Sequence, residues 1–544
     1  MKRLLACILI MTSVVSTLAG CDNKQNQDTQ EPITFVFYNA DGQEDPWSDP
    51  VARKITEATG VSLEVDYPVN SDQKRIALMT ASGEYPDLAY AKGDSESLIE
   101  AGAFIDMSDL IDQYGPNIKK LYGSEYEKLR YSKEDPSIYQ LCSSGVGGEI
   151  STTSGNAQLQ WAVLKENKYV IPKTLYQYEK AIKAYMDKYP TINGKNTIGI
   201  SLCCSDWHWY TTLSNPAGFI ANGSQDNGQW IIEDDTYKAY YKTAYDGQKE
   251  YFRWLNQMYA EGILDPEFAT QTNEEYLEKI AEGRVLGLMD ADWDYSSAVK
   301  ALKASNQYER TYAGLPVTMN ESVRCRSLMN SGLQIGWGVG ITKACKDPVR
   351  AIKFLDYLCS EEGQILLNWG IEGINYYVDE DGKRYRTNEE IKRYNEDTNY
   401  MEKTGVGLHK YPFPCYGDNV LDSTGNPYTL TSTQLLVREY DQEQKEAIKA
   451  WNVNSLTDIF PSSNEFTAPA YGPLWSQTIP KEIKSLQEQL DEISWKGLIE
   501  CVICDSDDFE TVWNKMQSDL EKAGRKEAEK LMTKYIQEQV NTSK

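Results

Sequence analysis

The stretch ITFVFYNADGQEDPWSDPVARKITEATGVSLEV, from Ile33 to Val65, decides the fold. Its β-rich beginning predicts a strand over Ile33–Tyr38, its middle carries a helical pattern that stops at Gly60, and Val61–Val65 predicts a second strand. A second helix and a third short strand, Pro86–Tyr90, follow in the same order. Strands that alternate with helices predict a mostly parallel sheet covered on both faces, and therefore an α/β protein.

Polar side chains follow the ends of these strands. Tyr38 and Asn39 close the first strand, and Asp94 lies just beyond the third. Ligands of open α/β sheets bind outside the carboxyl ends of the strands. We therefore predict that Tyr38, Asn39 and Asp94 contact a ligand, with ordinary turn chemistry as the alternative explanation.

The N-terminus has the layout of an export signal. Lys2 and Arg3 precede an apolar run that is too short to stay in a bilayer, and the run ends in Leu18-Ala19-Gly20-Cys21. This ending resembles the lipobox of bacterial lipoproteins, in which the cysteine is acylated. The resemblance implies a lipoprotein signal peptide at residues 1–20, lipidation of Cys21, and a position on the outer face of the cytoplasmic membrane.

Composition limits the domain organisation and the class of ligand. The chain has 544 residues, more than one hydrophobic core usually serves, so we expect at least two lobes. Residues 21–32 contain no large apolar side chain and predict a flexible tether. The formal charge of −26 disfavours nucleic acid and acidic polymers and favours a neutral or cationic ligand. Apart from Cys7 and Cys21, the chain has an odd number of cysteines. The sequence leaves two alternatives open, in which these cysteines are free thiols or form one or two disulfides.

Several motifs resemble those of one family. Gly262–Phe268 reads GILDPEF, Ser360–Gln364 reads SEEGQ, and Gly370–Tyr376 reads GIEGINY. Together with GEYPD at Gly83–Asp87, they resemble extracellular solute-binding proteins (family 1 type) of carbohydrate ABC importers, in their large lipoprotein branch. The resemblance implies a lipid-anchored substrate-binding protein that captures an oligosaccharide and delivers it to ABC permease subunits in the membrane. It also implies that the protein is not an enzyme.

The resemblance implies the architecture as well. We expect a two-lobe, periplasmic-binding-protein-like (type II) α/β fold with a hinge and an inter-lobe cleft. Residues 33–155 and 318–370 are assigned to lobe I, and residues 156–317 and 371–544 to lobe II, with the C-terminal helices in lobe II. The chain carries no phosphate-binding loop of the GxxxxGKS type, so the energy for transport must come from a separate subunit. We expect a monomer.

Aromatic and acidic side chains mark the candidate ligand site. Trp207, His208 and Trp209 follow an apolar strand and cannot all face one core. Asp292 and Trp293 follow another strand, and this pair suits a pyranose, because the ring takes C–H groups and the carboxylate accepts hydroxyl hydrogen bonds. The alternative is that Trp293 covers the core. The remaining candidates for ligand contact are Trp337, Glu372 and Tyr376.

Two other functions stay open at this stage. A secreted glycoside hydrolase would need two carboxylates at a fixed spacing across the scissile bond. A peptide-binding lipoprotein would need no closing hinge. We predict no catalytic residue, no cofactor and no metal site, because Thr191–Thr197, where many relatives carry a calcium loop, lacks the spaced carboxylates that calcium needs.

Overall fold

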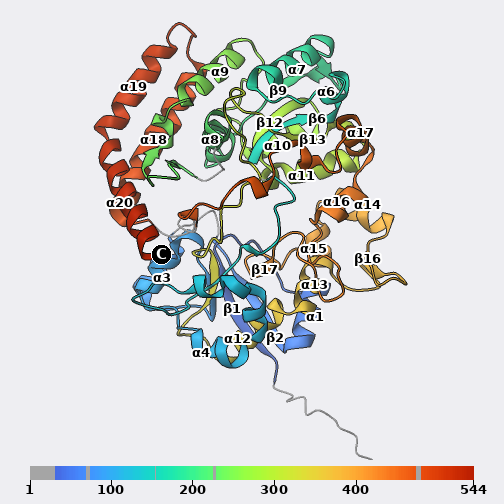
Figure 1. Ribbon diagram of the computed structural model, residues 1–544, viewed down its shortest axis with the longest axis vertical. Helices are drawn as coiled ribbons and strands as arrows, with labels where there is room; N and C mark the ends of the chain where they lie inside the picture. Colours follow the sequence, from blue (N-terminus) through green and yellow to red (C-terminus); the bar gives the residue numbers. More distant parts are fainter. Residues whose placement is uncertain (1–30, 69–73, 154, 224–227, 473–478, 544) are drawn as a thin grey trace, which may run out of the picture.

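The computed structural model describes residues 31–68, 74–153, 155–223, 228–472 and 479–543. The predicted signal peptide, the predicted lipidation site Cys21 and nearly all of the predicted tether lie outside these residues. The chain folds into two lobes, each built on its own sheet, and Figure 1 shows one above the other. The N-terminal strands lie in the lower lobe, lobe I, and the long C-terminal helices flank the upper lobe, lobe II.

Lobe I contains a five-stranded sheet in the order β2-β1-β3-β14-β4. Its strands are β1 (Ile33–Asn39), β2 (Val61–Asp66), β3 (Leu88–Tyr90), β4 (Leu141–Cys142) and β14 (Gly338–Ile341). As predicted, β1 is parallel to β2 and β3, whereas β14 runs antiparallel to β3 and β4. Gly60 ends the first helix with a left-handed φ of 68°, which explains why this helix stops where the sequence predicted.

The two faces of this sheet bury different side chains. Phe35 and Phe37 of β1 point into the main core of lobe I, whereas Tyr38 points to the opposite face and packs with Ile76 and Met79. The helices of lobe I are α1 (Pro50–Thr59), α2 (Arg75–Ser82), α3 (Ser95–Glu100), α4 (Ser108–Tyr114), α5 (Pro116–Tyr122), α12 (Pro348–Cys359), α13 (Glu361–Trp369) and α15 (Tyr400–Thr404).

The division of the chain between the lobes differs from the prediction. Tyr400, Phe413 and Tyr428 lie in the core of lobe I, and the ring of Phe413 lies 5.3 Å from that of Phe37 in β1. The assignment of all of 371–544 to lobe II is therefore wrong. These aromatic side chains complete the core beside β1 and α12, a contact between segments far apart in the sequence.

Lobe II contains a four-stranded sheet in the order β13-β6-β12-β9. Its strands are β6 (Gly155–Gln160), β9 (Ile198–Ile200), β12 (Val285–Ala291) and β13 (Tyr312–Leu315). β12 is parallel to β9 and antiparallel to β6. Every residue of β12 is buried, as expected for a central strand covered on both faces.

Helices surround the sheet of lobe II, and three long ones form its C-terminal flank (Figure 1). They are α6 (Trp161–Glu166), α7 (Leu175–Lys188), α8 (Asn215–Asn222), α9 (Gln248–Ala260), α10 (Asn273–Ala281), α11 (Asp292–Ala304), α17 (Gln442–Trp451), α18 (Lys481–Ile503), α19 (Phe509–Lys522) and α20 (Arg525–Ser543). An ion pair between Lys484 of α18 and Asp94, 3.3 Å long, joins this flank to lobe I.

Shorter elements connect and decorate the lobes. They are β5 (Gly145–Val146), β7 (Thr191–Ile192), β8 (Lys195–Asn196), β10 (Trp230–Ile232), β11 (Ala239–Tyr241), β15 (Tyr377–Val378), β16 (Arg384–Tyr385), β17 (Cys415–Tyr416), α14 (Asn388–Glu396) and α16 (Thr433–Glu439). The cysteines in the described ranges carry free thiols, so none of the disulfides that the sequence left open forms there. Within the same ranges, no helix is both long and apolar enough to cross a membrane.

Candidate functional site

The candidate site lies where two neighbouring strands of lobe II end. β9 and β12 pair in parallel, with Ile200 beside Gly287, so the chain leaves both strands at the same edge of the sheet. The segment after β9 carries Cys203–His208, and α11 begins at Asp292, directly after β12. Open α/β sheets bind ligands at such an edge. The strand pairing therefore brings together two segments that the sequence separates widely.

Trp207 and Trp293 form a pair of exposed aromatic rings at this edge. Their side chains are 50% and 55% exposed. Their ring centroids lie 6.2 Å apart, and the ring planes are inclined by only 12°. Neighbouring large apolar rings in solvent mark an interaction surface more often than scattered ones do. The pair offers the flat apolar surface that suits the C–H face of a sugar ring.

His208 lies buried beneath this pair, and its ring stacks on Trp207 with centroids 3.9 Å apart. Its Nδ1 lies 2.6 Å from Oδ1 of Asp206, and its Nε2 lies 3.4 Å from Oδ1 of Asp294. Burial lowers the pKa of His208, but the interactions with Asp294 and Asp206 outweigh burial, so this pKa is raised above its ordinary value. The two carboxylates thus favour the protonated imidazole and fix the orientation of its ring.

Four carboxyl groups lie in these two segments and make the site acidic. Burial, and then the charge of Asp294, raises the pKa of Asp290 well above its ordinary value, and the hydroxyl of Tyr276 donates to Asp290 Oδ2 at 2.9 Å. Although Asp292 is exposed as a residue, protein atoms crowd its carboxyl group and raise its pKa to about 6. Among the ion pairs of the described chain, no lysine or arginine reaches these groups or Asp206.

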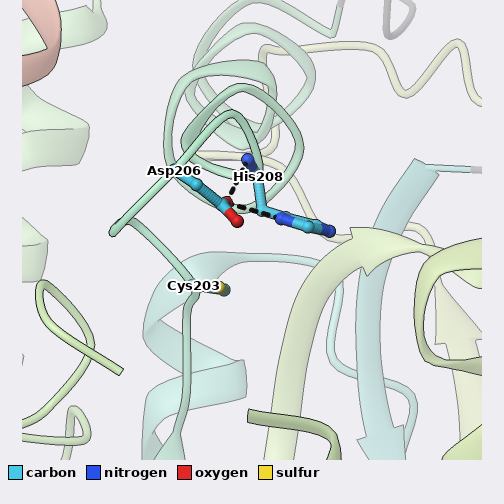
Figure 2. A group of neighbouring side chains, drawn as sticks. All are labelled: Cys203, Asp206 and His208. Atoms are coloured by element: carbon cyan, nitrogen blue, oxygen red, sulfur yellow. Dashed lines mark hydrogen bonds and ion pairs between the residues drawn. The ribbon is translucent and has the colours of Figure 1, made fainter. Parts of the chain in front are cut away.

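Asp294 is a buried carboxyl group with one oxygen that lacks a partner in the part of the chain that the structure describes. Its side chain is only 4% exposed, and its Oδ2 has no hydrogen-bond partner among the described residues. On the other side of His208, Cys203 and Asp206 approach closely enough that one ligand atom of each of the three residues lies within 4.8 Å of the others. Figure 2 shows these three side chains converging from one loop.

A family model described as "Bacterial extracellular solute-binding protein" matches residues 51–370, more than half of the chain. The chain belongs to the bacterial extracellular solute-binding proteins. This confirms the family that the sequence motifs resemble. The solute-binding protein is 24% identical over 392 residues to the fructooligosaccharide ABC transporter substrate-binding protein FusA of Streptococcus pneumoniae, covering 67% of this chain and 70% of FusA. It is also 21% identical to lipoprotein LipO of Bacillus subtilis over 374 residues, 66% of this chain and 71% of LipO.

Solved structures confirm the two-lobe α/β fold. The structure of FusA in complex with kestose aligns with a TM-score of 0.66 at 18% identity, over 94% of this solute-binding protein and 100% of that chain. The alginate-binding protein AlgQ2, solved without calcium ion, aligns with a TM-score of 0.65 at 18% identity, over 94% and 99% of the two chains. FusA and AlgQ2 are both named as binding proteins.

Two residues predicted to contact the ligand are buried in this solute-binding protein. Trp209 begins a helical turn that reverses away from Trp207, and its ring stacks on Trp495 with centroids 6.1 Å apart and is 2% exposed. Tyr38 is also 2% exposed, because it lies on the helix-covered face of β1. Neither side chain offers surface to a ligand in this structure, and both serve the packing of their lobes.

Three predicted residues of lobe I lie near the carboxyl ends of its strands. Asn39 lines a cavity of about 360 Å³ together with Trp47 and Tyr411. Trp337 is partly buried, with the ammonium of Lys92 5.4 Å above its ring. Asp94 lies next to Lys92 and holds the ion pair with α18 that was described above. These residues do not contact the tryptophan pair in this structure.

Glu372 and Tyr376, also predicted, lie elsewhere. They line a separate cavity of about 540 Å³ with Ile365 of α13 and Tyr357 of α12. The ring of Tyr376 packs against Trp369 at 5.8 Å. The structure therefore groups Trp207, His208, Asp292 and Trp293 from the predicted set and leaves this pair apart from them.

The sequence analysis missed one further cluster, around His409. His409 Nε2 lies 2.6 Å from Oδ2 of Asp49, and Nδ1 lies 3.4 Å from Oδ2 of Asp45. The ring packs against Trp47, with centroids 4.5 Å apart and the ring planes inclined by 57°. The chain has only two histidines, and each lies between two aspartates and against a tryptophan. The scarcity of histidine in the sequence could have drawn attention to His409, but only the fold shows which residues surround it.

Proposed function

We propose that this solute-binding protein captures an oligosaccharide on the Trp207–Trp293 pair and delivers it to ABC permease subunits in the membrane. The observation that carries the proposal is the pair itself, two half-exposed and nearly parallel rings at the shared edge of β9 and β12. Asp206 and Asp292 flank the rings and supply oxygens that accept hydrogen bonds from sugar hydroxyls. The likeness to FusA, whose solved structure holds kestose, supports this proposal.

The charge of the site favours a neutral sugar over a uronate. Asp206, Asp290, Asp292 and Asp294 lie within the two segments, and none is paired with lysine or arginine in the described chain. An anionic ligand would meet the carboxylates of the half-exposed Asp206 and the exposed Asp292, because the buried imidazole of His208 already pairs with Asp206 and Asp294. Hydroxyl groups, in contrast, donate hydrogen bonds to carboxylates such as those of Asp206 and Asp292.

The proposal includes a membrane anchor. Acylation of Cys21 would hold a monomeric protein on the outer face of the cytoplasmic membrane, and residues 21–32 would give the lobes freedom to reach the permease. The similarity to lipoprotein LipO supports the anchor. Closure of the two lobes around the sugar would then present the loaded form to the transporter.

Thermal melting of the full-length chain in detergent tests the proposal. A ligand that binds only the folded protein raises the melting midpoint as its concentration exceeds its Kd. We expect a shift with one class of neutral oligosaccharides, lost in Trp293→Ala and retained in Tyr176→Ala, a matched control that removes another exposed aromatic ring, 70% exposed, from α7.

Two results would contradict the proposal. If no neutral sugar shifts the midpoint and peptides do, the protein binds peptides. If the sugar is cleaved during incubation, as chromatography of the recovered ligand would show, the protein is a hydrolase. If Trp293→Ala still shows the sugar-induced shift in melting midpoint, the protein binds the sugar, but at a site other than the tryptophan pair.

A further inference from the structure

The loop between β9 and α8 holds three metal-ligand side chains in a fixed arrangement. Cys203, Asp206 and His208 follow one another in the pattern C-x-x-D-x-H, and their ligand atoms lie within 4.8 Å of one another (Figure 2). The hydroxyl of Thr212 accepts from the backbone N–H of Cys203 at 3.1 Å and lies 2.8 Å and 3.0 Å from the carbonyl oxygens of Cys203 and His208. The Thr212 hydroxyl thus links Cys203 and His208 by hydrogen bonds even without a ligand.

A buried carboxylate on the other side of the ring holds the imidazole in place. Asp294 faces Nε2 of His208, its side chain is 4% exposed, and its Oδ2 has no hydrogen-bond partner in the described chain. Asp290 lies close enough that its charge and that of Asp294 disfavour each other. The cationic partner of Asp294 among the described residues is the imidazole of His208, because no lysine or arginine pairs with this carboxylate there. A cation on Nδ1 would take the place of the imidazolium proton there, and Asp294 would continue to accept the Nε2 proton.

We propose that Cys203, Asp206 and His208 bind a thiophilic divalent cation of the Zn²⁺ class, with Asp294 as the carboxylate that orients the imidazole. A thiolate, an imidazole and a carboxylate form a ligand set that zinc accepts, whereas calcium and magnesium prefer oxygen alone. His208 would bind through Nδ1, the nitrogen that now lies 2.6 Å from Asp206, and donate its Nε2 proton to Asp294.

The side chains leave room for entry and for a fourth ligand. Cys203 is fully buried at the bottom of the cluster, whereas the side chain of Asp206 is 47% exposed. A cation can therefore enter past Asp206, and water can complete its coordination, as in zinc sites with three protein ligands. Because Trp207 stacks directly on His208, the cation would also hold one half of the tryptophan pair in place.

Binding of the cation releases a proton from the protein. The thiol of Cys203 loses its proton to solvent, and the imidazole keeps one proton, on Nε2. An imidazolium would release its Nδ1 proton as well. Because a cysteine binds metal as the thiolate, the cation competes with the thiol proton of Cys203. Affinity should therefore fall as the pH is lowered.

The cluster around His409 provides an internal contrast. Asp49 accepts hydrogen bonds from the backbone of Val51 and Ala52 and contacts His409, so both of its oxygens have partners. No thiol belongs to this group. We therefore assign Asp45, Asp49 and His409 to the packing of α1 and expect the metal only at Cys203.

Cobalt absorption tests the proposal on the full-length chain, reduced, stripped with chelator and kept in detergent. Titration with Co²⁺ should give a thiolate-to-cobalt charge-transfer band in the near ultraviolet, and Zn²⁺ should displace it. The band should disappear in Cys203→Ser and persist in Cys204→Ser, a matched control in which the neighbouring buried thiol is removed. Asp294→Asn should weaken Co²⁺ binding about 10- to 100-fold, the usual effect of losing a carboxylate that orients a metal-binding histidine.

The outcomes separate the possibilities. Absence of the band in the wild type, or its persistence in Cys203→Ser, would overturn the proposal, because another thiol or none would then hold the metal. If Cys203→Ser fails to fold, Asp206→Asn replaces it as the test variant. The side chain of Asp206 is half-exposed, so this substitution should leave the fold intact, and the loss of a ligand should still weaken Co²⁺ binding. Unchanged Co²⁺ affinity in Asp206→Asn would then count against the site. None of these results depends on the sugar.

Discussion

Removal of the Trp293 ring should weaken oligosaccharide binding about 20-fold. Trp293 is 55% exposed, so of the roughly 250 Å² that a tryptophan can bury, about 140 Å² is available to a ligand. A sugar that covers about half of this surface removes roughly 70 Å² of apolar area from water, which at about 25 cal/mol per Å² is worth ~1.7 kcal/mol. Converted to affinity, this free energy gives the expected change in Kd.

Isothermal titration calorimetry with the sugar found in the melting experiment measures this change. Wild type, Trp293→Ala and Tyr176→Ala are compared, because Tyr176 is an exposed aromatic side chain on another element, α7. Trp293→Phe should retain part of the affinity, since a smaller ring still covers part of the sugar. An unchanged Kd in a folded Trp293→Ala protein would refute the reasoning, because exposed ring surface would then play no part in binding.

Burial raises the pKa of Asp491 to about 6, so the stability that this group contributes is present below its unfolded pKa of about 4 and is lost as the pH rises through about 6. Urea unfolding of the wild type, measured relative to Asp491→Asn, should therefore show a loss of up to about 3 kcal/mol between about pH 4 and pH 8. A difference between the two proteins that stays constant with pH would contradict this. Asp49→Ala removes the N-cap of α1 and the partner of buried His409, and should cost about 2–4 kcal/mol in urea unfolding. Asp45→Ala should cost less, since its carboxylate lies 3.4 Å from the same ring; equal losses would count against the cap. Cys21→Ala should move the protein from the membrane to the soluble fraction and abolish labelling with palmitate; retention on the membrane would argue against lipidation.

Local signals explain what the sequence could predict of lobe I. The strands and helices between Ile33 and Tyr90 were predicted because each ends at a residue with its own conformational preference, such as Gly60 and Gly83, both of which have left-handed φ angles. The position of Trp293 followed in the same way, from a buried strand that ends just before it.

Contacts between distant segments explain what the sequence could not predict. Phe413 belongs to lobe I only because its ring reaches Phe37 across most of the chain. Trp209 is buried because the chain turns after Trp207, and aromatic composition alone does not reveal which side of a turn faces a core.

The candidate metal site shows the same limit more sharply. The prediction of no metal site rested on the missing carboxylates of Thr191–Thr197, and the C-x-x-D-x-H pattern did not enter it. Pairing of β9 with β12 places Asp294 beside His208, and only this proximity makes the loop a plausible site. The sequence contains the ligands but not the distance that joins them to the orienting carboxylate.

The exposed tryptophans of the described chain are Trp207 and Trp293, and this gives the protein a built-in optical probe. Collisional quenchers reach exposed indoles far more readily than buried ones, so these two rings should be the most readily quenched tryptophans of the described residues. The surrounding carboxylates should attract caesium and repel iodide, which makes the two quenchers unequal at this site. Protection from caesium would therefore follow ligand capture in real time, without any label.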